Sequence, residues 1–103
     1  MTMTRKELMR HMLEKYGETA LANGWEARAI IRPMRRQSDE APQCYLYTGT
    51  PEQKLLAGDA VAMNGVDYLV TRGDVEAIGG ESLYVWAILR RADEAALCTE
   101  ESA

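Results

Sequence analysis

Four arginines gather in a short stretch of the chain that contains no acidic residue. They are Arg28, Arg32, Arg35 and Arg36. Because a guanidinium group binds phosphate or carboxylate through two parallel hydrogen bonds, this cluster suits an anionic partner. It also fits a solvated edge that meets acidic groups of another subunit. The net charge of −4 and the lack of aromatic residues among the arginines favour this subunit contact over nucleic acid.

The other residue types that carry chemistry are isolated in the sequence. Cys44, Cys98 and His11 do not have the spacing of a zinc site, so we expect no metal and no cofactor. Asp74 and Glu76 could form an acid–base pair, but carboxylates at a surface turn are usually only solvated. We therefore expect a protein that is not an enzyme.

A helix is the first element that the pattern predicts. Thr4 and Glu7 have the spacing of a capping box, and Gly17 is suited to end the helix. Between them, apolar residues recur at helical spacing at Leu8, Met9, Met12, Leu13 and Tyr16. The sequence predicts a helix over residues 5–16, with His11 on its polar face. Its methionine-rich stripe fits core packing or a surface docked on a neighbour.

After Gly17 the pattern changes to the alternation that is typical of strands. Asn23-Gly24 and Asn64-Gly65 are strong signals for tight hairpins. The strands that we expect cover residues 18–22, 25–32, 44–48, 60–63, 66–71, 74–78 and 82–91. The polar segment 34–43 has almost nothing to bury, which predicts a long exposed loop.

The last predicted strand, residues 82–91, is apolar on both faces. Such a strand needs cover on both sides, so we expect it to be central and Trp86 to be the packing centre. One helix followed by six or seven antiparallel strands predicts a mainly β (α+β) fold. A small, partly closed β-barrel, with the helix plugging one end or face, hides the strand edges best.

The length of 103 residues fits a single domain, which we place at residues 1–91. Residues 92–103 contain four acidic and no basic side chains, which predicts an acidic flexible tail behind a neutral body. No apolar run approaches the roughly 20 residues of a membrane span. The first residues lack the apolar stretch of a signal peptide, so we expect a cytoplasmic protein.

Three parts of the sequence resemble small structural proteins of tailed phages and prophages. They are Gly58-Asp59-x-Val61, then Gly65-x-x-Tyr68-x-Val70, and the run Tyr84-Val85-Trp86-Ala87-Ile88-Leu89. The helix ahead of Ile31-Arg32-Pro33 is similar to the same group. The members most similar are head-completion and head–tail joining proteins. The resemblance implies a small β-barrel with long loops, assembled as a ring that contacts portal, head-completion or tail proteins.

The sequence therefore leads to two functional hypotheses. The first is a non-enzymatic subunit of a phage or prophage particle, present in the bacterial cytoplasm and then in the virion. Its assembly surface would be the loop of residues 34–43, which carries Arg35 and Arg36 next to Arg28 and Arg32. Asp74, Glu76 and Glu81 would be the complementary acids. The alternative is a small single-stranded nucleic-acid-binding β-barrel, in which Tyr45 and Tyr47 would stack on bases.

Overall fold

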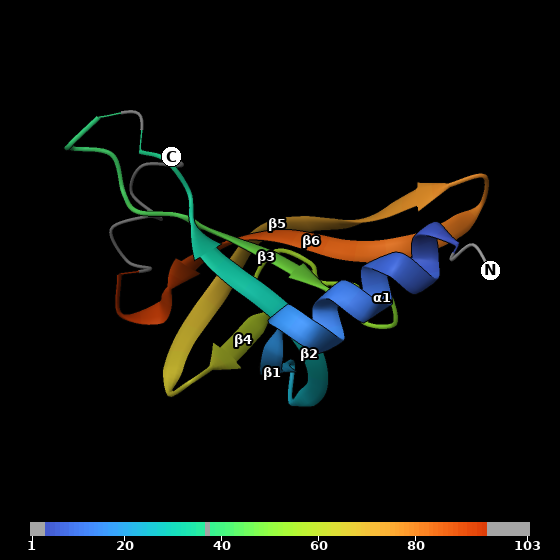
Figure 1. The fold of residues 1–103 in the computed structure, drawn as a ribbon. Helices are drawn as coiled ribbons and strands as arrows, with labels where there is room; N and C mark the ends of the chain where they lie inside the picture. Colours follow the sequence, from blue (N-terminus) through green and yellow to red (C-terminus); the bar gives the residue numbers. More distant parts are fainter. Residues whose placement is uncertain (1–3, 37, 95–103) are drawn as a thin grey trace.

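The structure is a computed structural model that describes residues 4–36 and 38–94. Its elements are α1 (Arg5–Tyr16), β1 (Glu18–Ala22), β2 (Trp25–Pro33), β3 (Tyr45–Gly49), β4 (Ala60–Met63), β5 (Val66–Ile78), β6 (Glu81–Arg91) and the short 3₁₀ helix η1 (Ala92–Glu94). The strands of the described residues form a closed antiparallel barrel in the order β1-β2-β3-β6-β5-β4 (Figure 1). The predicted mainly β fold is confirmed, and the barrel is fully closed.

Two asparagine-glycine turns set the register of the short hairpins. Asn23 and Gly24 have φ angles of 53° and 82°, and Asn64 and Gly65 have φ angles of 52° and 79°. Two consecutive left-handed residues are the signature of a type I′ turn, whose twist matches that of the flanking strands. Both predicted hairpins are confirmed, as β1–β2 and β4–β5.

The barrel closes where β1 meets β4, along a short seam. The register pairs only Leu21 with Ala62 and Ala22 with Val61. Asn23 extends the seam, because its N–H donates to the carbonyl of Ala60 (2.8 Å) and its Oδ1 accepts from the N–H of Ala60 (3.2 Å). At the other end of the seam, Asn64 Nδ2 donates to Glu18 Oε2 (3.0 Å).

β5 is one continuous strand where the sequence predicted two. The pairing with β6 shifts between Val70 and Arg72, so that Thr71 is an extra residue in a β-bulge. The bulge interrupts the alternation of side chains without ending the strand, which explains the false break in the pattern. A second shift, between Glu76 and Ala77, leaves Leu83 as an extra residue of β6, so that 11 residues of each strand face one another.

The core of the barrel combines small residues with one large aromatic side chain. Its fully buried members are Ala20, Ala22, Ala29, Tyr47, Leu55, Val85, Ala87 and Leu89, and Val61, Met63 and Val70 complete it. The prediction that Trp86 is the packing centre is wrong. Val85 and Ala87 point inward, so Trp86 lies on the outer face of β6 and is half-buried.

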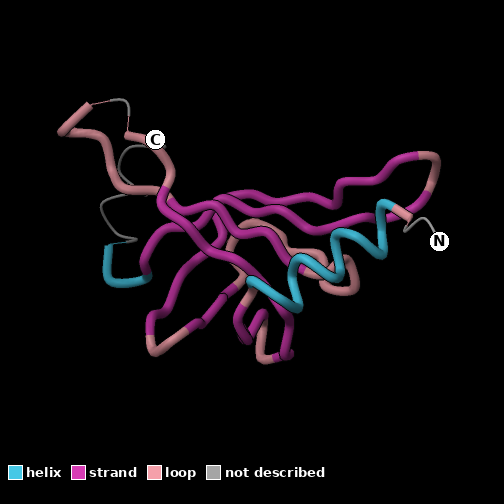
Figure 2. The backbone as a smooth tube through the Cα atoms, in the orientation of Figure 1, coloured by secondary structure: helices cyan, strands magenta, loops and turns pink. Residues whose placement is uncertain are grey.

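α1 is attached to the barrel by a narrow apolar contact. The helix begins at Thr4, whose hydroxyl accepts from the N–H of Glu7 (3.1 Å). It ends at Gly17, which is extended and donates its N–H to the carbonyl of Leu13 (2.8 Å). α1 packs against β6 and β2, alongside the β5–β6 hairpin (Figure 2), and buries only Leu13. Within the described residues, no helix has the length and apolar character needed to cross a membrane.

The molecule is elongated, measuring 50 × 27 × 22 Å. The tip of the β5–β6 hairpin lies at one end, and the loop that joins β2 to β3 lies at the other (Figure 1). After β6 the chain continues into η1, which packs against β5. The predicted acidic tail therefore starts with an ordered turn, and its residues 95–103 lie outside the described residues.

Candidate functional site

Arg28 holds the end of α1. Its Nη2 donates to the main-chain oxygens of Glu14 (2.9 Å) and Gly17 (2.5 Å), and its Nη1 reaches Thr19 Oγ1 (3.5 Å). The last carbonyls of a helix have no partner within the helix, and a cationic donor there also complements the helix dipole. Three of the five N–H donors of Arg28 are thus bound within the chain.

The other three arginines lie at or beyond the end of β2. Arg36 donates to the carbonyls of Ala41 (3.0 Å) and Asp39 and so holds the β2–β3 loop. Arg32 and Arg35 are exposed, and neither makes a side-chain hydrogen bond or ion pair with another described residue. The four arginines that lie close together in the sequence therefore differ in the structure: Arg28 and Arg36 bind main-chain carbonyls, and Arg32 and Arg35 do not.

The base of the β2–β3 loop is closed by hydrogen bonds. The N–H of Met34 donates to the carbonyl of Cys44 (2.9 Å), one residue pair beyond the β2–β3 ladder. Gln43 Nε2 donates to the carbonyls of Met34 and Cys44, both at 2.8 Å. The loop thus projects Arg35 from a fixed base.

The acidic residues predicted to complement the arginines lie on the β5–β6 hairpin. Asp74 is already engaged, because it faces Lys54 Nζ at 3.8 Å and accepts from the N–H of Val75 (2.8 Å). Glu76 and Glu81 are exposed nearer the tip of the hairpin. Asp74 and Glu76 share the outer face with Trp86 and Tyr84, their cross-strand partners.

The two tyrosines considered for base stacking belong to the interior of the barrel. Tyr47 is completely buried, and Tyr45 is half-buried against the core. The ring of Tyr45 contacts that of Tyr68 edge to face, with 5.3 Å between the ring centres. Burial raises the pKa of Tyr47 to about 12. A side chain enclosed in this way cannot stack on a nucleic-acid base.

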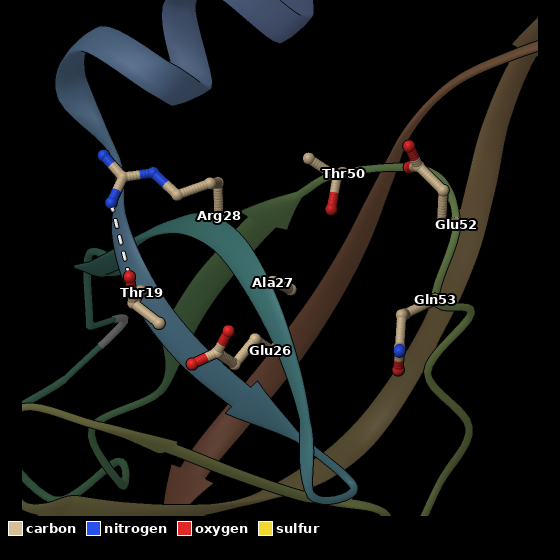
Figure 3. Close-up of a pocket in the computed structure, with 7 residues that line it drawn as sticks. All are labelled: Thr19, Glu26, Ala27, Arg28, Thr50, Glu52 and Gln53. Atoms are coloured by element: carbon tan, nitrogen blue, oxygen red, sulfur yellow. Dashed lines mark hydrogen bonds between the residues drawn. The ribbon is translucent and has the colours of Figure 1, made fainter.

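A cleft of about 330 Å³ separates the β1–β2 hairpin from the segment after β3 (Figure 3). It is lined by Thr19, Glu26, Ala27, Arg28, Thr50, Glu52 and Gln53. Arg28 is turned toward Thr19 and α1, and the side chains of Glu52 and Gln53 point in opposite directions. Glu52 is bound by Arg10 at 2.7 Å. The polar groups of this cleft therefore do not converge on a common point.

The thiol of Cys44 and the imidazole of His11 are not grouped with other potential metal ligands among the described residues. Cys44 is half-buried, with its Sγ 3.8 Å from the carbonyl oxygen of Pro42, and His11 is exposed on α1. Cys98 lies outside the described residues. In the part of the chain that the structure describes, no three His, Cys, Asp or Glu residues are grouped as metal ligands.

Large apolar side chains are exposed on α1, where the sequence left core packing or a docked surface open, and at the tip of the β1–β2 hairpin, which the sequence did not indicate. On α1, Leu8, Met12 and Tyr16 are 50%, 42% and 64% exposed. Beside them lies an apolar depression of about 240 Å³, the α1 hollow, lined by Arg5, Leu8, Met9, Met12 and Leu83. At the tip of the β1–β2 hairpin, Trp25 is 67% exposed. The spacing of apolar residues in the sequence predicts the apolar face of a helix, but it does not show how many of those side chains the fold will bury.

Comparison with known proteins adds no relative to these observations, since no family model, curated protein or solved structure matches the chain.

Proposed function

We propose that the protein is a non-enzymatic structural subunit of a tailed phage or prophage particle, assembled as a ring at the head–tail junction. One observation carries the proposal. The two ends of the elongated barrel differ in charge: residues 32–44, around the β2–β3 loop, carry three basic and two acidic side chains, whereas residues 74–81 of the β5–β6 hairpin carry three acidic and no basic side chains. A subunit with complementary ends is suited to contact one particle component at each end.

The fold supports this use of the ends. In a closed barrel the strands find their partners within the chain, so association depends on what projects from the barrel. An exposed charge pair contributes only about 0–1 kcal/mol and weakens with salt. A ring repeats each weak contact in every subunit, and this repetition makes the assembly strong without any tight pairwise contact.

Charge reversal at the basic end tests the proposal. The double variant Arg32→Glu/Arg35→Glu should fold like the parent but fail to restore infectious particles in a prophage that lacks the gene. The control Lys54→Glu/Arg72→Glu makes the same change of net charge at two exposed positions that lie outside both α1 and the β2–β3 loop. It should restore infectious particles.

Two results would contradict the proposal. One is full recovery of infectious particles by the Arg32→Glu/Arg35→Glu variant. The other is binding of single-stranded oligonucleotides by the parent, with a steep salt dependence, that is lost in this variant. That second result would favour the nucleic-acid-binding alternative.

A further inference from the structure

We infer that neighbouring copies of this chain associate by inserting Trp25 of one copy into the α1 hollow of the next. The inference builds on the proposed ring, for which it supplies the contact between subunits. The two charged ends would then remain available for the components above and below the ring.

Trp25 is presented as a projecting anchor. It directly follows the type I′ turn at Asn23-Gly24 and pairs with Ala22, so its backbone is fixed by the hairpin. Its side chain is 67% exposed, and Leu21 beside the same turn is 46% exposed. Tryptophan is among the residues that contribute most to protein–protein binding, because it buries a large apolar area at a small entropic cost.

The α1 hollow has the size and lining that an indole ring requires. Its volume is about 240 Å³, and a cavity of roughly 150 Å³ is sufficient to bind benzene. Leu8, Met9, Met12 and Leu83 supply apolar walls, and methionine side chains adapt their shape to an inserted ring. Arg5 at the rim could lie over the face of the indole as a cation–π partner.

The charges around the two surfaces are complementary. The basic residues of α1 (Arg5, Lys6, Arg10 and Lys15) outnumber its two acidic residues, Glu7 and Glu14. The paired part of the β1–β2 hairpin, residues 18–29, carries Glu18 and Glu26 and one basic residue, Arg28, whose guanidinium is bound to the end of α1 in its own chain. Electrostatic complementarity of this kind directs the encounter and fixes the orientation of the partner. It selects a second copy of the chain as the occupant of the α1 hollow.

The geometry makes the contact heterologous. The hairpin tip and α1 are separate surfaces of one subunit (Figure 1), and the exposure of Trp25 shows that it does not fill the hollow of its own chain. Each copy therefore offers one knob, which is Trp25, and one hole, which is the α1 hollow. Contacts of this type close into a ring when the rotation between copies permits and otherwise continue as a chain.

Complementation between two variants tests this arrangement. Trp25→Ala removes the knob, and Met12→Glu places a charge in the hole. Each variant alone should associate about 30-fold more weakly than the parent in sedimentation velocity, which corresponds to about 2 kcal/mol at 1.4 kcal/mol per tenfold change. Their mixture retains one intact knob and one intact hole, so it should form a 1:1 complex that grows no further.

The matched control for Met12→Glu is Leu56→Glu, which introduces the same charge at an exposed apolar residue outside both the hairpin tip and the α1 hollow. It should associate like the parent, and circular dichroism should show that all variants are folded. A parent that stays monomeric, variants that associate normally, or a mixture that forms no complex would overturn the inference. These measurements use purified protein in solution, so their failure is distinct from a failure of the proposed function, which is judged by infectious particles.

Discussion

The ring of Tyr47 lies against the backbone of Gly49, two residues further along β3. A Cβ atom at Gly49 would lie only 2.5 Å from Oη and 2.6 Å from Cε1 of Tyr47. Both residues face the interior of the barrel, where they pair with Ala87 and Val85 of β6. The absence of a side chain at Gly49 therefore creates the space in which the largest fully buried side chain of the core is held.

Replacing Gly49 by Ala should destabilise the protein by about 1–3 kcal/mol, because the added methyl group forces the ring of Tyr47 away from its position. Urea denaturation would measure the loss. In a Tyr47→Leu background the same methyl group should cost much less, since the side chain that it displaces is gone. If Gly49→Ala lowers the free energy of unfolding equally in the two backgrounds, contact with the ring of Tyr47 is not the reason why residue 49 must be glycine.

Burial of Tyr47 should make the stability of the barrel sensitive to alkaline pH. The pKa of Tyr47 is raised from 10.0 to about 12, so between these values the unfolded chain loses a proton that the folded chain retains. The contribution of the neutral Tyr47 side chain to the free energy of unfolding is intact below about pH 10. It is lost as the pH rises through 12, at about 1.4 kcal/mol per pH unit.

Tyr47→Phe should reduce this alkaline loss of stability. At neutral pH the substitution should cost little, because the Tyr47 hydroxyl has no hydrogen-bond partner among the described residues. Tyr16→Phe is the control, since Tyr16 is 64% exposed. Denaturation curves at about pH 9 and about pH 11.5 would decide, and identical pH profiles for Tyr47→Phe and the parent would contradict the assignment.

Removal of the Arg28 side chain should loosen the end of α1. Arg28→Ala leaves the carbonyls of Glu14 and Gly17 without this donor and should lower the free energy of unfolding by about 1–2 kcal/mol. Arg32→Ala, four residues further along β2, should stay within about 0.5 kcal/mol of the parent. Thermal melts followed by circular dichroism would compare the two, and equal melting temperatures would contradict the proposed function of Arg28 as a helix cap.

The cost of truncating apolar residues should follow the side of the barrel on which each one lies. Leu89→Ala, in the fully buried core, should cost about 2–5 kcal/mol. Trp86→Ala on the outer face should cost about 1–2 kcal/mol, and Trp25→Ala should stay within about 0.5 kcal/mol of the parent. Iodide should quench Trp25 more strongly than Trp86 in the monomer. A Trp86→Ala variant less stable than Leu89→Ala would reverse this order.

Features that depend on local chemistry could be predicted from the sequence. The bounds of α1 follow from Thr4 and Gly17, and the two tight hairpins follow from their asparagine-glycine turns. The inward face of β6 could not be predicted, because a strand that is apolar on both sides contains no periodic signal. Leu55 was also missed as a core residue, since it enters the barrel from the irregular segment between β3 and β4.

The candidate site was less predictable than the fold. The sequence grouped four arginines by position, but whether a guanidinium is free depends on which carbonyls the fold brings near it. Arg28 meets the end of α1 only because β2 folds back along β1. In the same way, the exposure of Trp25 depends on how the β1–β2 hairpin projects, and the depression next to Met12 depends on how α1 is placed on the barrel. Neither arrangement is encoded by a local pattern.

The asparagines of the two tight turns have a second function, because each also bonds across the seam between β1 and β4. Glycine could replace Asn23 or Asn64 in the turn itself, since it adopts the same left-handed conformation without strain. It could not replace the side-chain bonds to Ala60 and Glu18. In these asparagines the backbone conformation thus forms the turn, whereas the side-chain amide stabilises barrel closure. An Asn→Gly exchange at both turns should preserve the hairpins while hydrogen exchange accelerates selectively at the β1–β4 seam.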